Sequence, residues 1–231
     1  MEYENDNNKN VFSENKAFLI PCLVVWITGA VILAIYDKVS IQIWANGFYS
    51  PWQNDIWMTV TDMGDTFFFL AVFFIGSLLS YRFSLYLSVT GIVMVVSSTL
   101  LKYLFVHPRP LTVLAEMNLL ESINTVPGYA MKCCNSFPSG HTATAFALFC
   151  TCALFMRNRV LKFAAFVLAL AVGYSRIYLM QHFFEDVYAG SLIGVVTAVA
   201  AYCLLSKARW VNNLKFISTS PFRQIKSRFL H

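Results

Sequence analysis

The chain has 231 residues, of which 58% are hydrophobic and only 13% charged, with a formal net charge of +5 and a mean hydropathy of +0.59. Soluble domains have roughly 45–50% apolar and about 25% charged residues. A chain this short cannot bury so much apolar surface in its own core, so the composition excludes an ordinary soluble domain and a disordered chain. We therefore expect an all-α, polytopic membrane protein, because a bilayer solvates the excess apolar surface.

Apolar runs near the 20-residue length of a spanning helix predict six transmembrane helices in a single membrane domain, residues 1–231. In chain order these helices cover residues 17–36, 60–80, 83–106, 140–156, 160–178 and 184–206. The charge-free core of the second run is short, so its helix is expected to begin earlier, with Asp62 and Asp65 near its outer end. The tryptophan-rich segment 39–57 is expected at the membrane interface, where aromatic residues collect.

The distribution of lysine and arginine orients these helices. With both termini in the cytoplasm, twelve of the 17 cations lie inside, as the positive-inside rule favours. Residues 207–231 contain six of them and no acidic residue. We expect this segment to be a basic cytoplasmic tail that lies on anionic lipid, and we expect no nucleic-acid partner.

Ionisable residues near membrane depth cost roughly 2.5–3.5 kcal/mol each at a helix centre, so a cluster of them indicates function. The six-helix topology brings four polar groups to the same outer face. These are Lys102 and Arg109 after the third helix, Ser139, Gly140 and His141 at the start of the fourth, Arg176 at the end of the fifth, and His182 and Asp186 at the start of the sixth.

These residue types predict a site for a phosphate-like anion. Arginine and lysine supply donors that match oxyanions. Ser139, Gly140 and His141 open a helix, whose N–H groups and dipole favour negative charge, although Ser139 alone reads as a helix cap. His182 and Asp186 are four residues apart, so on a helix the carboxylate fixes the imidazole tautomer and leaves one nitrogen free to attack. His141 is then available as a general acid.

The six cysteines give no metal-binding spacing, so we expect no zinc site. Cys133 and Cys134 lie in the long outer loop, and the other four lie in apolar runs, where they pack as small apolar residues.

Three motifs contain the clustered residues. They are Lys102-x6-Arg109-Pro110, then Pro138-Ser139-Gly140-His141, then Ser175-Arg176-x5-His182-x3-Asp186. With all eleven specified positions present in order, the chain resembles the type 2 phosphatidic acid phosphatases, whose superfamily also includes bacterial acid phosphatases and vanadium haloperoxidases.

The resemblance implies a phosphatase of phosphoric monoesters or diphosphates that needs neither metal nor cofactor. It implies that His182 attacks phosphorus and forms a phosphohistidine, that Asp186 orients His182, and that His141 protonates the leaving oxygen. The phosphoryl oxygens would be held by Lys102, Arg109, Ser139, Gly140 and Arg176.

An outward-facing site in so apolar a phosphatase indicates a lipid phosphate substrate. The compact size with six helices resembles the bacterial members of the family, which implies a bacterial inner membrane with the site on the periplasmic or extracytoplasmic side. Undecaprenyl diphosphate and lipid A are the favoured substrates, and phosphatidylglycerol phosphate or phosphatidic acid are alternatives. The loop 111–137 is expected to cover the site and to select the headgroup. A vanadate-dependent haloperoxidase and a catalytically dead lipid-binding or transport protein are alternatives of other classes. The sequence leaves the oligomeric state open.

Overall fold

The structure, a computed structural model, describes residues 11–130 and 132–213 and contains only helices in this part of the chain. Most of the predicted basic tail, from residue 214 onward, lies outside the described residues. Each of the six apolar runs contains a long helix. These are α2 (Lys16–Ile35), α5 (Thr66–Leu79), α6 (Tyr81–Leu104), α8 (Gly140–Phe155), α9 (Arg159–Tyr178) and α10 (Phe184–Lys207).

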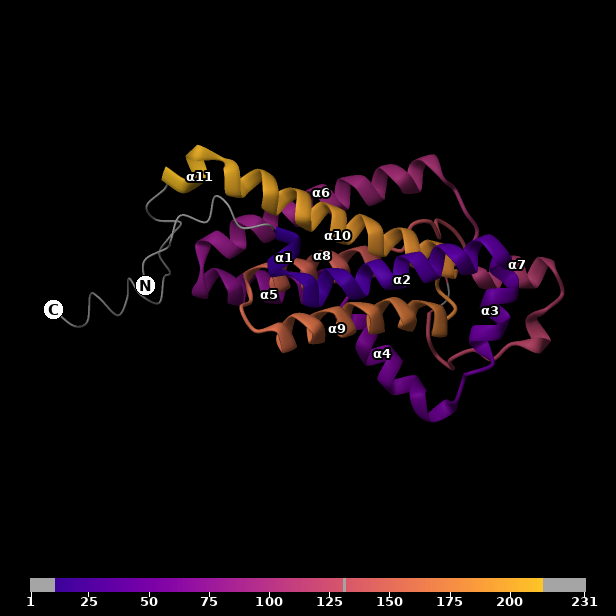
Figure 1. Cartoon of the computed structure of the whole chain (residues 1–231). Coiled ribbons are helices and arrows are strands. Elements are labelled where there is room, and N and C mark those ends of the chain that lie inside the picture. Colours follow the sequence, from indigo (N-terminus) through magenta and orange to yellow (C-terminus); the bar gives the residue numbers. More distant parts are fainter. Residues whose placement is uncertain (1–10, 131, 214–231) are drawn as a thin grey trace.

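Shorter helices form the connections and the chain ends. They are α1 (Val11–Glu14), α3 (Lys38–Asn46), η1 (Pro51–Gln53), α4 (Asn54–Asp62), α7 (Pro110–Glu116), η2 (Leu120–Ser122) and α11 (Arg209–Asn213). Figure 1 shows α3 and α7 at one end of the molecule and α1 and α11 at the other.

Among the described residues, four or five helices qualify as membrane-spanning by length and composition. Helices α2, α6, α9 and α10 are long and apolar enough, and η1–α4 with α5 forms a fifth candidate bent by 52°. Helix α8 is apolar but has only 16 residues. The count of six therefore remains a prediction.

The predicted second helix, residues 60–80, is in fact broken. Helix α4 ends at Asp62 and α5 begins at Thr66, with Asp65 as its N-cap, whose carboxylate accepts the N–H of Phe67 at 3.0 Å. The break has a packing reason: a Cβ atom on Gly64 would lie 2.7 Å from the carbonyl oxygen of His141. The chain at Gly64 is thus pressed against the first turn of α8.

Helix α8 lies at the centre of the bundle, between α6, α9 and α10, and most of its residues are buried. It approaches α10 closely because two glycines face its backbone. A Cβ on Gly190 would lie 2.6 Å from the Ser139 oxygen, and one on Gly194 would lie 2.6 Å from the Ala143 oxygen. Small residues allow such close crossings of membrane helices. This crossing sets Ser139 beside Asp186, whose carbonyl oxygen accepts the Ser139 N–H at 3.0 Å.

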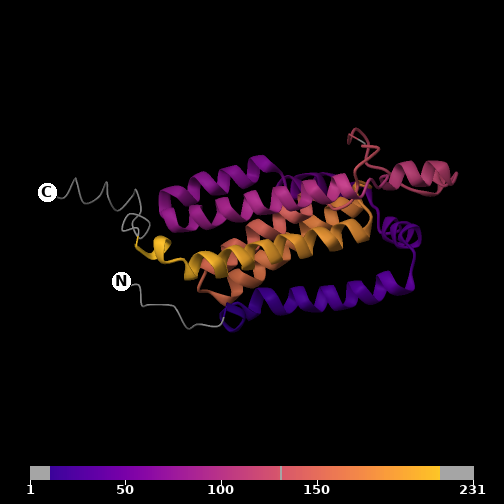
Figure 2. The same ribbon diagram turned by 90° about the horizontal axis from the view of Figure 1, so that it is seen from above.

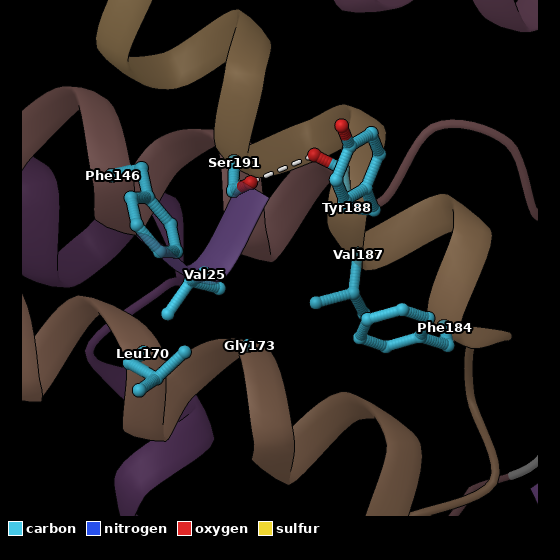
Figure 3. A pocket seen from close by; sticks show the side chains of 8 residues that line it. All are labelled: Val25, Phe146, Leu170, Gly173, Phe184, Val187, Tyr188 and Ser191. Carbon is cyan, nitrogen blue, oxygen red and sulfur yellow. Dashed lines mark hydrogen bonds between the residues drawn. The ribbon is translucent and has the colours of Figure 1, made fainter. Parts of the chain in front are cut away.

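Helix α2 runs along one side of the bundle (Figure 2). Trp26 ties it to α10, because its Nε1–H donates to the Ser191 hydroxyl at 2.9 Å. A small cavity of about 40 Å³ lies beneath α2, lined by Val25, Phe146, Leu170 and other mostly apolar side chains (Figure 3). Its lining has no charged side chain that could bind a phosphate group, so it is not the predicted anion site.

Candidate active site

Four chain segments meet at the end of the bundle that carries α3 and α7. The Lys102 ammonium group donates to the Asn135 carbonyl oxygen at 2.9 Å, which joins the end of α6 to the loop before α8. Ser136 N–H donates to the His107 oxygen at 3.0 Å, and its hydroxyl donates to the Asp186 carboxylate at the start of α10. The predicted residues from 102, 109, 139–141 and 182–186 are therefore joined through hydrogen bonds at one place.

The backbone fixes His182 before α10 begins. Met180 adopts a left-handed conformation with φ of 55°, which reverses the chain after α9, and the His182 N–H donates to the Arg176 carbonyl at 3.2 Å. His182 precedes the N-cap residue Phe183, so His182 and Asp186 do not share a helix face as the sequence suggested. Instead Asp186 turns back from the first turn of α10 and accepts the Phe183 N–H at 2.9 Å.

His182 and Asp186 form a buried pair. His182 is 2% exposed and Asp186 is fully buried, and 3.5 Å separates His182 Nδ1 from Asp186 Oδ2. The same carboxylate oxygen accepts the Ser136 hydroxyl. This arrangement favours the tautomer with a proton on Nδ1, so that Nε2 carries a lone pair, which lies 3.5 Å from Arg109 Nη1.

The pKa of His182 is lowered to about 4, first because burial penalises the charged ring and then because of Arg109 and Arg176, although Asp186 opposes the shift. The imidazole is therefore neutral at neutral pH, as a nucleophile must be.

Neutral oxygen atoms hold the three cations. Arg109 Nη1 donates to the Gln181 carbonyl at 2.7 Å and lies 3.5 Å from His182 Nε2, and Arg109 Nε donates to the Cys134 carbonyl at 2.9 Å. Arg176 Nη1 donates to the hydroxyls of Thr61 at 2.6 Å and Tyr129 at 3.0 Å.

Between described residues, no carboxylate lies within ion-pair distance of Lys102, Arg109 or Arg176. Arg109 and Arg176 are also almost fully buried, at 6% and 3% exposure. Buried charges without a counter-ion are costly, so this end of the bundle favours binding of an anion.

The N-terminus of α8 faces the same region. Ser139 is the N-cap, and its hydroxyl oxygen accepts from Thr142 N–H at 3.4 Å and from the Thr142 hydroxyl at 2.8 Å. The N–H groups of Gly140 and His141 belong to the first turn, where a helix has no internal acceptors. His141 Nε2 lies 3.8 Å from Asp65 Oδ2, and the charges of Arg176 and His182 act on it.

One group of potential metal ligands occurs among the described residues. The ligand atoms of His107, Glu185 and Asp186 lie within 4.8 Å of one another. Glu185 already pairs with Lys38 at 3.4 Å, and the positive side chains around Asp186, such as Lys102, disfavour binding of a metal cation there.

Several residues at the site were not found by sequence reasoning. Ser136, Thr61, Tyr129 and Gln181 contact the predicted residues, but they stand in loops or at a helix end without a recognisable motif. The sequence places Asp65 near the outer end of the second helix but does not predict its contact with His141. That contact depends on the break between α4 and α5, which composition does not reveal.

An oriented neutral histidine, cations without a carboxylate partner and a helix N-terminus together form a site suited to a phosphoryl group, on an all-helical scaffold of apolar helices. Residues 77–210 match the PAP2 superfamily, and the chain belongs to this family.

Individual relatives in this family match only part of the chain, at modest sequence identity. The chain is 28% identical over 127 residues to undecaprenyl-diphosphatase BcrC of Bacillus subtilis. This alignment covers 55% of this chain and 60% of that protein. The chain is 34% identical over 88 residues to a lipid A 1-phosphatase of Porphyromonas gingivalis. This alignment covers 36% of this chain and 17% of that protein. The alignments thus span less than two thirds of these curated relatives.

Two solved structures share the fold. The crystal structure of Aquifex aeolicus LpxE covers 71% of this chain and 93% of its own, with a TM-score of 0.63 and 24% identity. That of a transmembrane PAP2-type phosphatidylglycerolphosphate phosphatase from Bacillus subtilis covers 85% and 98%, with a TM-score of 0.52 and 22% identity. At these identities the likeness concerns the fold.

Proposed function

We propose that the protein is an integral membrane lipid phosphatase that works through a phosphohistidine without a metal ion. The observation that carries this proposal is the neutral, buried His182, oriented by Asp186 and adjoined by cations that have no carboxylate partner. Such a site attracts the negative charge of a phosphoryl group and has a nucleophile beside it.

In the first step Nε2 of His182 attacks phosphorus and forms the N–P bond while the bond from phosphorus to the leaving oxygen breaks. Asp186 stabilises the positive charge that develops on the ring. His141 gives its proton to the leaving oxygen. The product leaves with that proton, and His182 carries the phosphoryl group.

In the second step His141, now neutral, takes a proton from a water molecule, whose oxygen attacks phosphorus while the bond between phosphorus and His182 Nε2 breaks. This releases inorganic phosphate and restores neutral His182 and protonated His141. Lys102, Arg109, Arg176, the Ser139 hydroxyl and the Gly140 N–H hold the phosphoryl oxygens in both steps. They supply the charge stabilisation that a metal ion gives in other phosphatases.

We favour an envelope lipid as substrate, either undecaprenyl diphosphate or lipid A. The names of the relatives in Bacillus subtilis and Porphyromonas gingivalis support these two choices. Phosphatidylglycerol phosphate and phosphatidic acid are the alternatives. The protein would lie in a bacterial inner membrane with six spans, cytoplasmic termini, a basic tail at 207–231 and the site facing outward.

The proposal is tested with purified protein in detergent by phosphate release from each of these four lipids, with and without EDTA. We expect release from at least one lipid, no loss with EDTA, inhibition by vanadate, and no turnover or phosphoenzyme in His182→Ala. Gel filtration and a melting curve check that His182→Ala is folded.

Near-normal turnover of His182→Ala would refute the nucleophile. No release from any lipid would favour a lipid-binding or transport protein, and bromide oxidation that requires vanadate would favour a haloperoxidase. Loss of activity with EDTA would refute metal independence.

A further inference from the structure

The break between α4 and α5 contacts two of the site residues at once. Thr61, in the last turn of α4, is 2% exposed and accepts a hydrogen bond from Arg176 Nη1 at 2.6 Å. Asp65, the first residue before α5, lies 3.8 Å from His141 through its Oδ2. The break therefore supplies one partner to a phosphate-binding arginine and another to the proposed general acid.

The position of Asp65 is fixed from two sides. Its Oδ1 accepts the Phe67 N–H at 3.0 Å, which holds the carboxylate as the cap of α5. The preceding residue, Gly64, has no room for a side chain, since a Cβ there would lie 2.7 Å from both the His141 oxygen and Val172 Cγ1. The Asp65 side chain is partly exposed, but its hydrogen bond to the Phe67 N–H and the close packing of Gly64 against α8 fix the carboxylate near His141.

Asp65 is also the acidic group among the charges that act on His141. Burial of the ring disfavours a protonated imidazole most strongly, and the other three charges, on Arg176 of α9, His182 in the turn before α10 and Lys132 in the loop before α8, act in the same direction. A general acid must nevertheless hold its proton until the leaving oxygen needs it. A carboxylate about 4 Å away favours the protonated ring and orients it.

We propose that Asp65 is a positioning residue for His141: the broken helix α4–α5 holds its carboxylate beside the imidazole, where it orients the ring towards the leaving oxygen and favours the protonated form that a general acid needs. This inference rests on the proposed phosphatase function. It adds to that function a carboxylate that is separated from the motifs by 37 residues or more of sequence, as the numbering of Asp65 and Lys102 shows.

The role has a chemical consequence that depends on the substrate. When the leaving group is the alkoxide of a lipid alcohol, a strong base, the leaving oxygen needs a proton in the transition state. When the leaving group is a lipid phosphate, as in hydrolysis of a prenyl diphosphate, it is a much weaker base and needs the proton less. Loss of Asp65 should therefore harm monoester hydrolysis more than diphosphate hydrolysis.

The test compares wild type with Asp65→Asn, Asp65→Glu and a matched control, Asp55→Asn, which removes an exposed carboxylate from α4. The kcat and KM values are measured across pH with the lipid phosphate that wild type hydrolyses fastest. We expect Asp65→Asn to lower kcat on a monoester by about tenfold or more, with little change in KM. The alkaline limb of its kcat–pH profile, where activity falls as His141 loses its proton, should move to lower pH by about one unit. Asp65→Glu should recover part of the loss, and Asp55→Asn should resemble wild type.

With a diphosphate substrate the limb should still move, but the loss of kcat should be smaller. Gly64→Ala should reproduce the shifted limb, because it pushes the break away from His141. The positioning role would be overturned if the alkaline limb of the kcat–pH profile of Asp65→Asn were unshifted. It would also be overturned if kcat fell by the same factor at every pH while KM rose. Failure of the phosphatase function looks different, since wild type itself would then release no phosphate.

Discussion

A single oxygen of Asp186 has three contacts. Oδ2 accepts the Ser136 hydroxyl and the Phe183 N–H and faces His182 Nδ1, while Oδ1 has no hydrogen-bond partner in the described structure. The carboxylate is therefore fixed by the loop and by its own helix before it acts on the histidine. The sequence could predict the histidine–aspartate pair from its motif. It could not predict Ser136, because only the fold of the loop brings that hydroxyl to the carboxylate.

The lowered pKa of His182 predicts the acid limb of the pH profile. Protonation removes the nucleophile, so kcat/KM should fall only as pH drops through about 4, well below the ordinary imidazole value of 6.5. A pH–rate profile between pH 3 and 8 measures this, and an acid limb near 6.5 would contradict it.

The same shift affects stability. The unfolded chain binds the His182 proton more tightly than the folded protein, so this residue makes stability fall as pH drops from 6.5 towards 4.

Helix α8 depends on its close contact with α10. The apolar runs predicted where the long helices lie, since hydrophobicity over about 20 residues is a property of composition. They predicted neither the break between Asp62 and Thr66 nor the short distance between α8 and α10 at Gly190 and Gly194. Both depend on which segments pack against each other in the folded chain.

Gly194→Leu should destabilise the protein, since its Cβ would meet the Ala143 carbonyl oxygen at 2.6 Å and backbone cannot yield easily. Overpacking of this kind costs about 1–3 kcal/mol. A melting curve in detergent should show a lower Tm, together with loss of activity as α8 moves from α10. Val196→Leu, on the exposed side of the same helix, serves as the control, and an unchanged Tm for Gly194→Leu would count against the tight crossing.

In the whole molecule, the candidate site and the described chain ends lie at opposite ends of the bundle (Figure 1). At the end away from the site, Lys162 is buried and its ammonium group donates to the Glu14 carbonyl at 2.8 Å, which ties the start of α9 to α1. The positive-inside rule then predicts that this end faces the cytoplasm and that the site faces outward.

Labelling of cysteines in whole cells tests this orientation. Cys133 and Cys134 are exposed beside the site, whereas Cys22 and Cys150 are buried. A membrane-impermeant maleimide should label wild type in intact cells but not the double variant Cys133→Ser, Cys134→Ser. In that double variant, Arg157→Cys at the opposite end should be labelled only after the cells are permeabilised. Labelling of Arg157→Cys in intact cells would reverse the orientation.

The loop before α8 holds Lys102 and Arg109 through carbonyl oxygens of residues 133–135, while the Cys133 and Cys134 side chains point to solvent. Every amino acid has the same carbonyl group, so the side chains of residues 133 and 134 can change while their hydrogen bonds to Arg109 persist, whereas Asn135, with φ of 56°, has a left-handed backbone that few residues adopt. Under the proposed function, changes at residues 133 and 134 would alter the outer surface of this loop beside the site while leaving the contacts of Lys102 and Arg109 in place.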